Sequence, residues 1–225
     1  PQDQIDSITT IFNSNIILTK EYNSISVVHN NNLSTFVPKP FFNTDNLKEY
    51  LQYSVKVLPN DLIAYDTFQN SELVNVYIPS MHLNNFLYDR FGSFEYKHSS
   101  TVLVENLLNI YTNSDETNFF VNVENGSFQI IVIKRKKIEF YNTFKFATKE
   151  DFIYYILFTA EQLQLNHEEF LLTFMGDIEK ESELYSIVYK YIRHIIFYKP
   201  AKSFSFKQKL EVSSHSNFVL LNQHL

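Results

Sequence analysis

The sequence predicts a mixed α/β protein built from two lobes, and three observations support this prediction. The 225-residue chain is 44% hydrophobic and 20% charged, which is the composition of a globular protein with a sizeable core. Between residues 118 and 198, three β-prone runs precede an alternation of helical and strand-like segments. The short polar stretch at residues 113–116 is the best candidate for a domain boundary. We therefore expect a first lobe at residues 1–113, a second at 114–200, and a tail at 201–225 that packs on one of them.

Composition and charge argue against several classes of function. The chain has 19 basic and 25 acidic residues, a net charge of −6, whereas binding to nucleic acid needs a basic field. It has no Cys, so disulfides, Cys-zinc sites and thiol catalysis are excluded. The longest apolar stretch, residues 152–160, is about half of the roughly 20 residues that span a membrane. With no signal peptide visible at its start, the chain is predicted to be soluble and cytoplasmic.

The second lobe has the clearer pattern, beginning with an antiparallel meander. Its three β-prone runs are residues 117–123, 127–133 and 138–146. Gly126 and the basic turn at residues 134–137 separate these runs, as expected for two consecutive hairpins. The structural interpretation of Gly126 is a hairpin turn, and that of Gly176 is a strand-to-helix turn.

A helix, a strand, a second helix and a last strand follow the meander. Thr148 and Asp151 resemble a capping box, and the apolar residues that follow recur at the helical period. The later elements are predicted at residues 170–174, 181–191 and 195–198. The predicted order of the second lobe is therefore β-β-β-α-β-α-β.

The first lobe is less regular. Strands are predicted at residues 24–29, 35–37, 62–68, 73–78 and 94–97, and a first helix at residues 2–12. Short polar side chains are expected to cap three further helices: Thr44 for one that includes Val55, Ser80 for one that ends at Gly92, and Ser99 or Ser100 for the last.

Four short strings of the chain add a resemblance to this pattern. They are Ser34-Thr35-Phe36-Val37-Pro38, Phe41-Phe42, Tyr77-Ile78-Pro79 and His98-Ser99-Ser100-Thr101. Together they resemble an uncharacterised bacterial family that has an actin-like ATPase fold, over residues 24–200. The β-β-β-α-β-α-β order is likewise that of a ribonuclease-H-like domain, and two such lobes in tandem are similar to pilus-assembly and cell-division actin homologues. In that fold the first lobe begins with three strands. Since this chain begins with a helix, its first lobe is predicted to be incomplete or divergent, with the N-terminal strands absent. The phosphate hairpin of the first lobe would lie before Pro1.

The resemblance implies a nucleotide site, which this chain keeps only in part. The phosphate hairpin of the fold reads Asp-x-Gly-Gly-Gly-Thr in the second lobe, and the matching positions here are 122–127. Asn122 replaces the acidic residue, Gly126 is the one glycine kept, and Ser127 keeps a hydroxyl. Gly176 is the one glycine kept of the adenosine-binding pair. A site without its carboxylate lacks the group that positions metal and water, so the chain is predicted to have no catalytic residue and no metal. ATP is the one cofactor that the resemblance leaves open.

The predicted function is a non-catalytic, actin-like scaffold or adaptor that binds another protein. The last predicted helix carries tyrosines that do not all share one face, which indicates an interface: Tyr185, Tyr189 and Tyr191. One alternative is a divergent ATPase that uses another carboxylate, such as Glu124 or Asp177. A second alternative is a nucleic-acid-associated module that uses the basic turn at residues 134–137, provided that other cations extend this turn into a patch.

One further pair of residue types is a candidate for catalysis. His98 lies next to Ser99 and Ser100, which suggests a base and a nucleophile. Neighbours in sequence rarely adopt the geometry of a catalytic triad, and the chain has no Gly-x-Ser-x-Gly elbow. Helix capping by the serines is therefore the predicted role.

Overall fold

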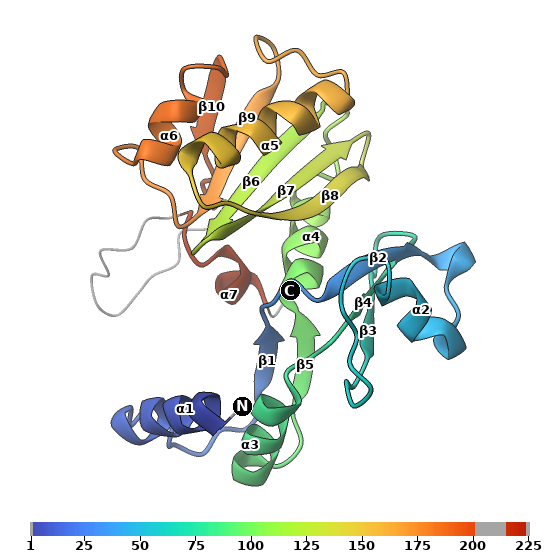
Figure 1. Ribbon diagram of the computed structural model, residues 1–225, viewed down its shortest axis with the longest axis vertical. Helices are drawn as coiled ribbons and strands as arrows, with labels where there is room; N and C mark the ends of the chain where they lie inside the picture. The colour runs from blue at the N-terminus through green and yellow to red at the C-terminus, as the bar shows by residue number, and fades with distance from the viewer. Residues whose placement is uncertain (1, 201–214, 224–225) are drawn as a thin grey trace. The chain divides into compact units, whose positions relative to one another are not determined.

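The computed structural model describes residues 2–200 and 215–223, and the chain divides into two compact units, Pro1–Glu105 and Asn106–Leu225 (Figure 1). The division lies inside helix α4 (Ser99–Ile110), earlier than the polar stretch at residues 113–116. Within the described ranges, none of the helices has the length and hydrophobicity that crossing a membrane requires.

The second unit contains one five-stranded sheet, and its element order is the predicted β-β-β-α-β-α-β. The elements are β6 (Asn118–Glu124), β7 (Ser127–Lys134), β8 (Lys137–Lys145), α5 (Lys149–Gln162), β9 (Leu171–Gly176), α6 (Glu183–Val188) and β10 (His194–Phe197). The spatial order is β10-β9-β6-β7-β8. β6, β9 and β10 are parallel, and β7 is antiparallel to both of its neighbours. The hairpins therefore form one side of the sheet and the two later strands form the other.

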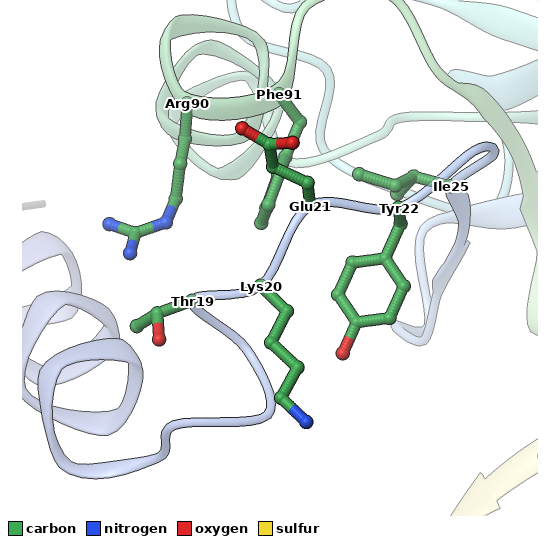
Figure 2. Close-up of a pocket in the computed structure, with 7 residues that line it drawn as sticks. All are labelled: Thr19, Lys20, Glu21, Tyr22, Ile25, Arg90 and Phe91. Atoms are coloured by element: carbon green, nitrogen blue, oxygen red, sulfur yellow. The ribbon is translucent and has the colours of Figure 1, made fainter.

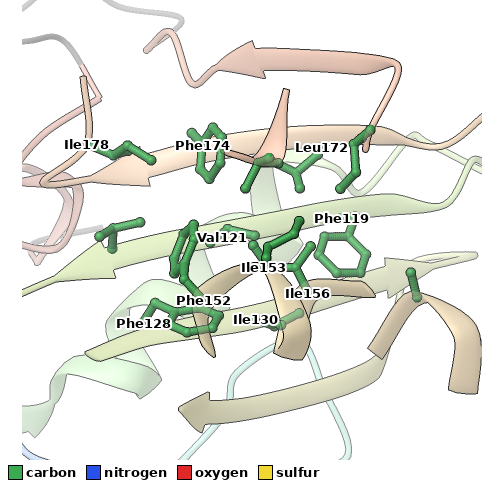
Figure 3. Close-up of a cluster of buried hydrophobic side chains, with 14 of the residues drawn as sticks. Phe119, Val121, Phe128, Ile130, Phe152, Ile153, Ile156, Leu172, Phe174 and Ile178 are labelled. Carbon is green, nitrogen blue, oxygen red and sulfur yellow. The ribbon is translucent and has the colours of Figure 1, made fainter. Parts of the chain in front are cut away.

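The main core of this unit lies between the sheet and helix α5, which crosses one face of it (Figures 1 and 3). Phe128 of β7 and Phe152 of α5 meet edge to face, with ring centroids 4.5 Å apart. Alternate residues of β6 and β9 complete the contact, because successive side chains of a strand lie on opposite faces. They are Phe119, Val121, Val123, Leu172 and Phe174, all buried. Burying each large apolar side chain contributes about 1.5–3 kcal/mol.

Helix α5 begins with the predicted capping box. The Thr148 hydroxyl accepts a hydrogen bond from the backbone N–H of Asp151, at 3.1 Å. The Asp151 carboxylate accepts one in return from the backbone N–H of Thr148, at 3.0 Å. The local sequence thus fixes where the helix starts and which face it turns to the sheet.

The described part of the tail packs on the second unit. Helix α7 (Phe218–Asn222) buries Phe218, whose ring meets that of Tyr198 edge to face at 5.0 Å. The Asn106 side chain donates a hydrogen bond to the carbonyl oxygen of Asn222, at 3.1 Å. Residues 201–214 and 224–225, which belong to the predicted tail, lie outside the described residues.

The first unit contains two small sheets. Its elements are α1 (Gln2–Ser14), β1 (Ser26–His29), β2 (Ser34–Pro38), the short 3₁₀ helices Lys39–Phe41 and Thr44–Asn46, α2 (Leu47–Leu51), β3 (Ala64–Thr67), β4 (Leu73–Tyr77), α3 (Met81–Phe91), β5 (Glu95–His98) and the first part of α4. β1 and β5 pair in parallel, and β2, β4 and β3 form an antiparallel sheet in that order. The second sheet has its own core of buried side chains: Val37, Leu51, Val74, Val76 and Ile78.

Two of the predicted helix caps are wrong. The Asn43 side chain, not that of Thr44, accepts the capping hydrogen bond from Asp45, and α2 ends at Leu51, before Val55. Ser99 is itself the first residue of α4, and its side chain is used elsewhere. The caps of α3 are confirmed, with Ser80 at its start and Gly92 at its end.

Candidate functional site

Asn122 lies near the end of β6, the central strand of the second unit's sheet, and its side chain already has a hydrogen-bond partner. Its amide N–H donates a hydrogen bond to Oε1 of Gln129, its register partner on β7, at 2.7 Å. Both side chains are buried. Buried polar groups in folded proteins are normally hydrogen-bonded, so each of these amides serves as the hydrogen-bond partner that the other needs inside the sheet.

The β6–β7 turn holds two more of the predicted site residues. Gly126 has φ +74°, the left-handed conformation that glycine adopts at little cost. A Cβ added to Gly126 would meet no atom within 4 Å, so the turn is open. Ser127 follows as the first residue of β7 and is buried. The hairpin turn alone therefore explains why position 126 is a glycine.

Gly176 ends β9 where the backbone of β6 comes very close. Its φ is +79°, and a Cβ built on it would lie 2.1 Å from the carbonyl oxygen of Val123. The N–H of the next residue, Asp177, donates to that same oxygen at 2.8 Å. On its other side, the N–H of Gly176 donates to the carbonyl oxygen of His215 at 3.0 Å. Residues of the tail thus contact the backbone of this glycine.

The four predicted site residues therefore gather at one end of the sheet. β6 and β9 are parallel and both end there, and the β6–β7 turn lies at the same end. Asn122 and Gly176, which are far apart in sequence, lie side by side, since a Cβ on Gly176 would lie 2.9 Å from Oδ1 of Asn122. Glu124 ends β6 and Asp177 follows β9, so the carboxylates named for the divergent ATPase also lie at this end. Among the described residues, no group of three or more His, Asp or Glu side chains could hold a metal ion.

The basic turn lies at the opposite end of the sheet. Arg135 and Lys136 both have positive φ, +48° and +66°, as a tight two-residue hairpin turn requires. The segment entering β6, the neighbour of β7, reaches the same end and carries an acidic pair at residues 115–116. Acidic neighbours oppose the continuous basic patch that nucleic-acid binding needs.

The first unit contains a buried polar cluster that the site predicted from sequence does not include. Its centre is the carboxylate of Asp66 on β3, which accepts three hydrogen bonds. The donors are the hydroxyl of Thr101 at 2.7 Å, the backbone N–H of His98 at 2.9 Å and the hydroxyl of Tyr77 at 3.0 Å. Burial raises the pKa of the Asp66 carboxyl, although these donors and the nearby charge of Lys97 oppose the shift. Burial and the neighbouring carboxylate also raise the pKa of Tyr77.

A second set of contacts joins β4 to the start of α4. The Asn75 amide donates to the hydroxyl oxygens of Ser100 and Thr101, both at 2.9 Å. The Ser100 hydroxyl lies 2.7 Å from Nδ1 of His98, which also accepts the backbone N–H of Ser100 at 3.2 Å. These contacts assign the imidazole proton to Nε2, which lies 3.4 Å from Oδ1 of Asn31. Burial lowers the pKa of His98 to about 4, so the ring is neutral at pH 7.

The interpretation of Ser99 and Ser100 as helix caps is wrong. Ser100 instead meets His98 as a nucleophile would meet a base, and Ser99 donates to Oδ1 of Asn30 at 2.8 Å. His98 and Ser100 are only 1% and 2% exposed, so a substrate has no access to them as they stand. The cluster therefore acts as polar core, holding β3 and β4 to the start of α4. The sequence contains one signal of it, the polar Asn75 inside the apolar strand β4.

The first unit also has a surface hollow of about 480 Å³ near the end of α3 (Figure 2). Its lining includes Lys20, Glu21, Tyr22 and Arg90. The Arg90 guanidinium lies over the ring of Phe12, 5.3 Å from its centroid. Side chains of both charges therefore line this hollow.

The fold is similar to that of solved proteins. A Bacteroides thetaiotaomicron VPI-5482 protein, described as having an actin-like ATPase fold and unknown function, matches with a TM-score of 0.82 at 16% identity, covering 97% of this chain and 80% of that one. A PilM-PilN type IV pilus biogenesis complex matches distantly, with a TM-score of 0.46 and 11% identity over 79% of this chain and 70% of that one. No curated protein is similar enough to count as a match.

The first of these similarities confirms the predicted fold class, a mixed α/β protein with an actin-like ATPase fold. A family model described as "Protein of unknown function (DUF3822)" matches residues 1–195, most of the chain. This match agrees with the resemblance to an uncharacterised family that the four short strings carry. The chain therefore belongs to the DUF3822 family of proteins with unknown function.

Proposed function

We propose that this chain is a non-catalytic, actin-like adaptor or scaffold that acts by binding another protein. The Asn122–Gln129 pair carries the proposal. Phosphoryl transfer needs a carboxylate or an equivalent group that holds metal and orients water. At the position where the fold's pattern has that carboxylate, the chain has a neutral amide that is hydrogen-bonded to Gln129 at 2.7 Å. Such an amide supplies no negative charge for a metal ion.

The contacts of Gly176 support the same proposal. A glycine that serves a nucleotide leaves its backbone N–H free for the ligand. The N–H of Gly176 is instead donated to the carbonyl oxygen of His215, and the His215 ring contacts the carbonyl oxygen of Ile178 through Nε2 at 2.6 Å. A nucleotide would have to displace this part of the tail before reaching the glycine.

Exposed aromatic side chains support a protein as the partner. Tyr154 and Phe158 lie one turn apart on α5, are 58% and 44% exposed, and stack with ring centroids 5.8 Å apart. Tyr189 and Tyr191 are exposed after α6. Aromatic residues are enriched at protein interfaces because they bury a large rigid area at little entropic cost.

Calorimetric titration with ATP, with and without Mg²⁺, tests the proposal on the longest natural form of the chain. We expect no saturable binding up to millimolar ATP by a protein that circular dichroism shows to be folded. The Asn122→Asp variant restores the carboxylate, and the Asn122→Leu variant serves as its matched control. Micromolar binding of Mg-ATP by the unmodified chain, lost in Asn122→Leu, would overturn the proposal in favour of the divergent ATPase.

A further inference from the structure

The outer edge of β10 is a strand edge that no other described strand covers. β10 is the last strand of the sheet on the β9 side. The N–H of Tyr198 donates to Phe174 on β9, at 2.9 Å. Backbone groups alternate between the two sides of a strand, so those of Ile196 also face β9 and those of Ile195 and Phe197 face outward. Among the described residues no strand pairs with these outward groups.

A hollow of about 330 Å³ adjoins the start of this edge. It is lined by Glu168, Tyr189, Lys190, Tyr191, Ile192 and Arg193. Tyr189 and Tyr191 are 64% and 51% exposed, and Ile196 of β10 is also exposed. A peptide lying along β10 would therefore find backbone partners on the strand and an aromatic-lined hollow next to it.

Three exposed cations lie next to this edge, in a chain whose net charge is −6. Lys190 and Arg193 line the hollow, and Lys199 follows the strand; all three are exposed. Within the described ranges none of them has a carboxylate partner. The one carboxylate of the hollow, Glu168, lies 3.5 Å from Nδ1 of His167. The free cations favour an acidic occupant.

We propose that β10 and the adjoining hollow form a docking site for an extended, acidic segment of a partner protein, which adds to the sheet as a sixth strand. Its backbone pairs with Ile195 and Phe197, an apolar side chain enters the hollow beside the tyrosines, and its carboxylates pair with Lys190 and Arg193. A second copy of this strand is disfavoured, because two edges flanked by cations repel each other. This inference rests on the proposed function, since it names the partner class that the adaptor binds.

Selection from a library of random twelve-residue displayed peptides tests the composition of the occupant. The target is the unmodified chain, and fluorescence anisotropy then measures the affinity of the selected sequences. We expect enrichment of Glu, Asp and β-branched residues. Enrichment of basic or proline-rich sequences would overturn the proposal.

Methylation of single backbone nitrogens in the best peptide tests strand addition without altering the protein. An N-methyl group removes a donor, so binding should fall at least tenfold at alternate positions and less than threefold at those between. This period of two is specific to a paired strand. Uniform effects along the peptide would overturn strand addition.

Two matched pairs of variants locate the site. Lys190→Glu with Arg193→Glu should weaken binding at least tenfold, whereas Lys134→Glu with Lys137→Glu, the same charge change at the other edge of the sheet, should change it less than twofold. Tyr189→Ala with Tyr191→Ala should likewise weaken binding, and Tyr154→Ala with Phe158→Ala should not. Peptides that depend on Tyr154 and Phe158 would overturn the β10 site while leaving the adaptor proposal intact. Tight ATP binding would overturn the adaptor proposal alone.

Discussion

The hydroxyl of Ser100 lies 2.7 Å from Nδ1 of His98, two residues earlier in the chain. The two residues belong to different elements, since His98 ends β5 and Ser100 lies in the first turn of α4. Their contact therefore fixes the bend between strand and helix. The backbone N–H of Ser100 also donates to Nδ1, so the imidazole serves the start of α4 in the way that a short polar cap usually does.

His98 should make stability depend on pH. Burial lowers its pKa to about 4 from 6.5, so the unfolded chain binds the proton more readily than the folded one. The stability that the neutral ring contributes is complete above pH 6.5 and is lost as pH falls towards 4. Between pH 7 and pH 5 this loss is about 2 kcal/mol. Urea unfolding at both pH values measures it.

The His98→Gln variant is the test of that slope, and His194→Gln, at an exposed position, is its control. His98→Gln should lose less stability than the unmodified chain between pH 7 and pH 5, and His194→Gln should lose as much. As pH falls, the raised pKa of Asp66 increases stability, whereas the lowered pKa of His29 decreases it as His98 does. Both effects are common to all three proteins and do not alter the comparison. Equal slopes in all three would contradict the assignment.

The Asn122–Gln129 pair should behave as a coupled unit of the sheet. Asn122→Leu or Gln129→Leu alone leaves a buried amide without its partner, which costs about 1–3 kcal/mol. The double variant removes both amides and should be destabilised by less than the sum of the single variants. A double-mutant cycle in urea measures the coupling. Strictly additive losses would show that the 2.7 Å contact contributes nothing to stability.

Gly176 and Gly126 form a natural comparison, because both have positive φ and only one is crowded. Gly176→Ala places a methyl group against the carbonyl oxygen of Val123 and should cost at least about 3 kcal/mol. Gly126→Ala meets open space and should cost only about 1–2 kcal/mol, the expense of a left-handed alanine. Thermal unfolding of the two variants measures which one loses more stability. Similar losses in both would contradict the prediction.

Substitutions in the turn at Arg135 and Lys136 should increase the stability of the chain. Both residues adopt left-handed conformations that Asn and Gly adopt more readily. Replacing them with Asn and Gly should stabilise the chain by about 1 kcal/mol. Lys134→Ala with Lys137→Ala removes two charges from the same turn without relieving these conformations. An equal gain in that control would mean that charge, and not backbone conformation, limits the turn.

The second unit was largely predictable from sequence because its signals are local. The Thr148–Asp151 capping box, the turn at Gly126 and the alternation of the meander all depend on residues close in the chain. Helix α6 is shorter than the predicted 181–191, since Ser182 caps it and it ends at Val188. Ser182 is a residue type that caps helices, but the helical spacing of the apolar residues extends beyond the C-terminal end of α6 and predicts a longer helix.

The buried cluster of the first unit was not predictable, because its contacts join distant positions. Asp66 meets His98 across 32 residues, and Asn75 meets Ser100 across 25. A residue pattern identifies polar groups but not which of them a fold will bring together. The same applies to the candidate site, where Asn122 and Gly176 become neighbours only through the parallel pairing of β6 and β9.

The strand order β10-β9-β6-β7-β8 has a consequence for the time course of folding. The meander of β6, β7 and β8 closes through two tight turns, and such local hairpins form in about 1–10 μs. β9 and then β10 join the opposite side only after the long crossovers that contain α5 and α6, and such non-local pairing is slower. During synthesis, β6 therefore presents an unpaired edge until β9 has emerged, and β9 presents one until β10 follows. A ribosome that pauses between residues 145 and 171 would prolong the first of these exposures, and with it the time in which β6 can pair with the wrong strand.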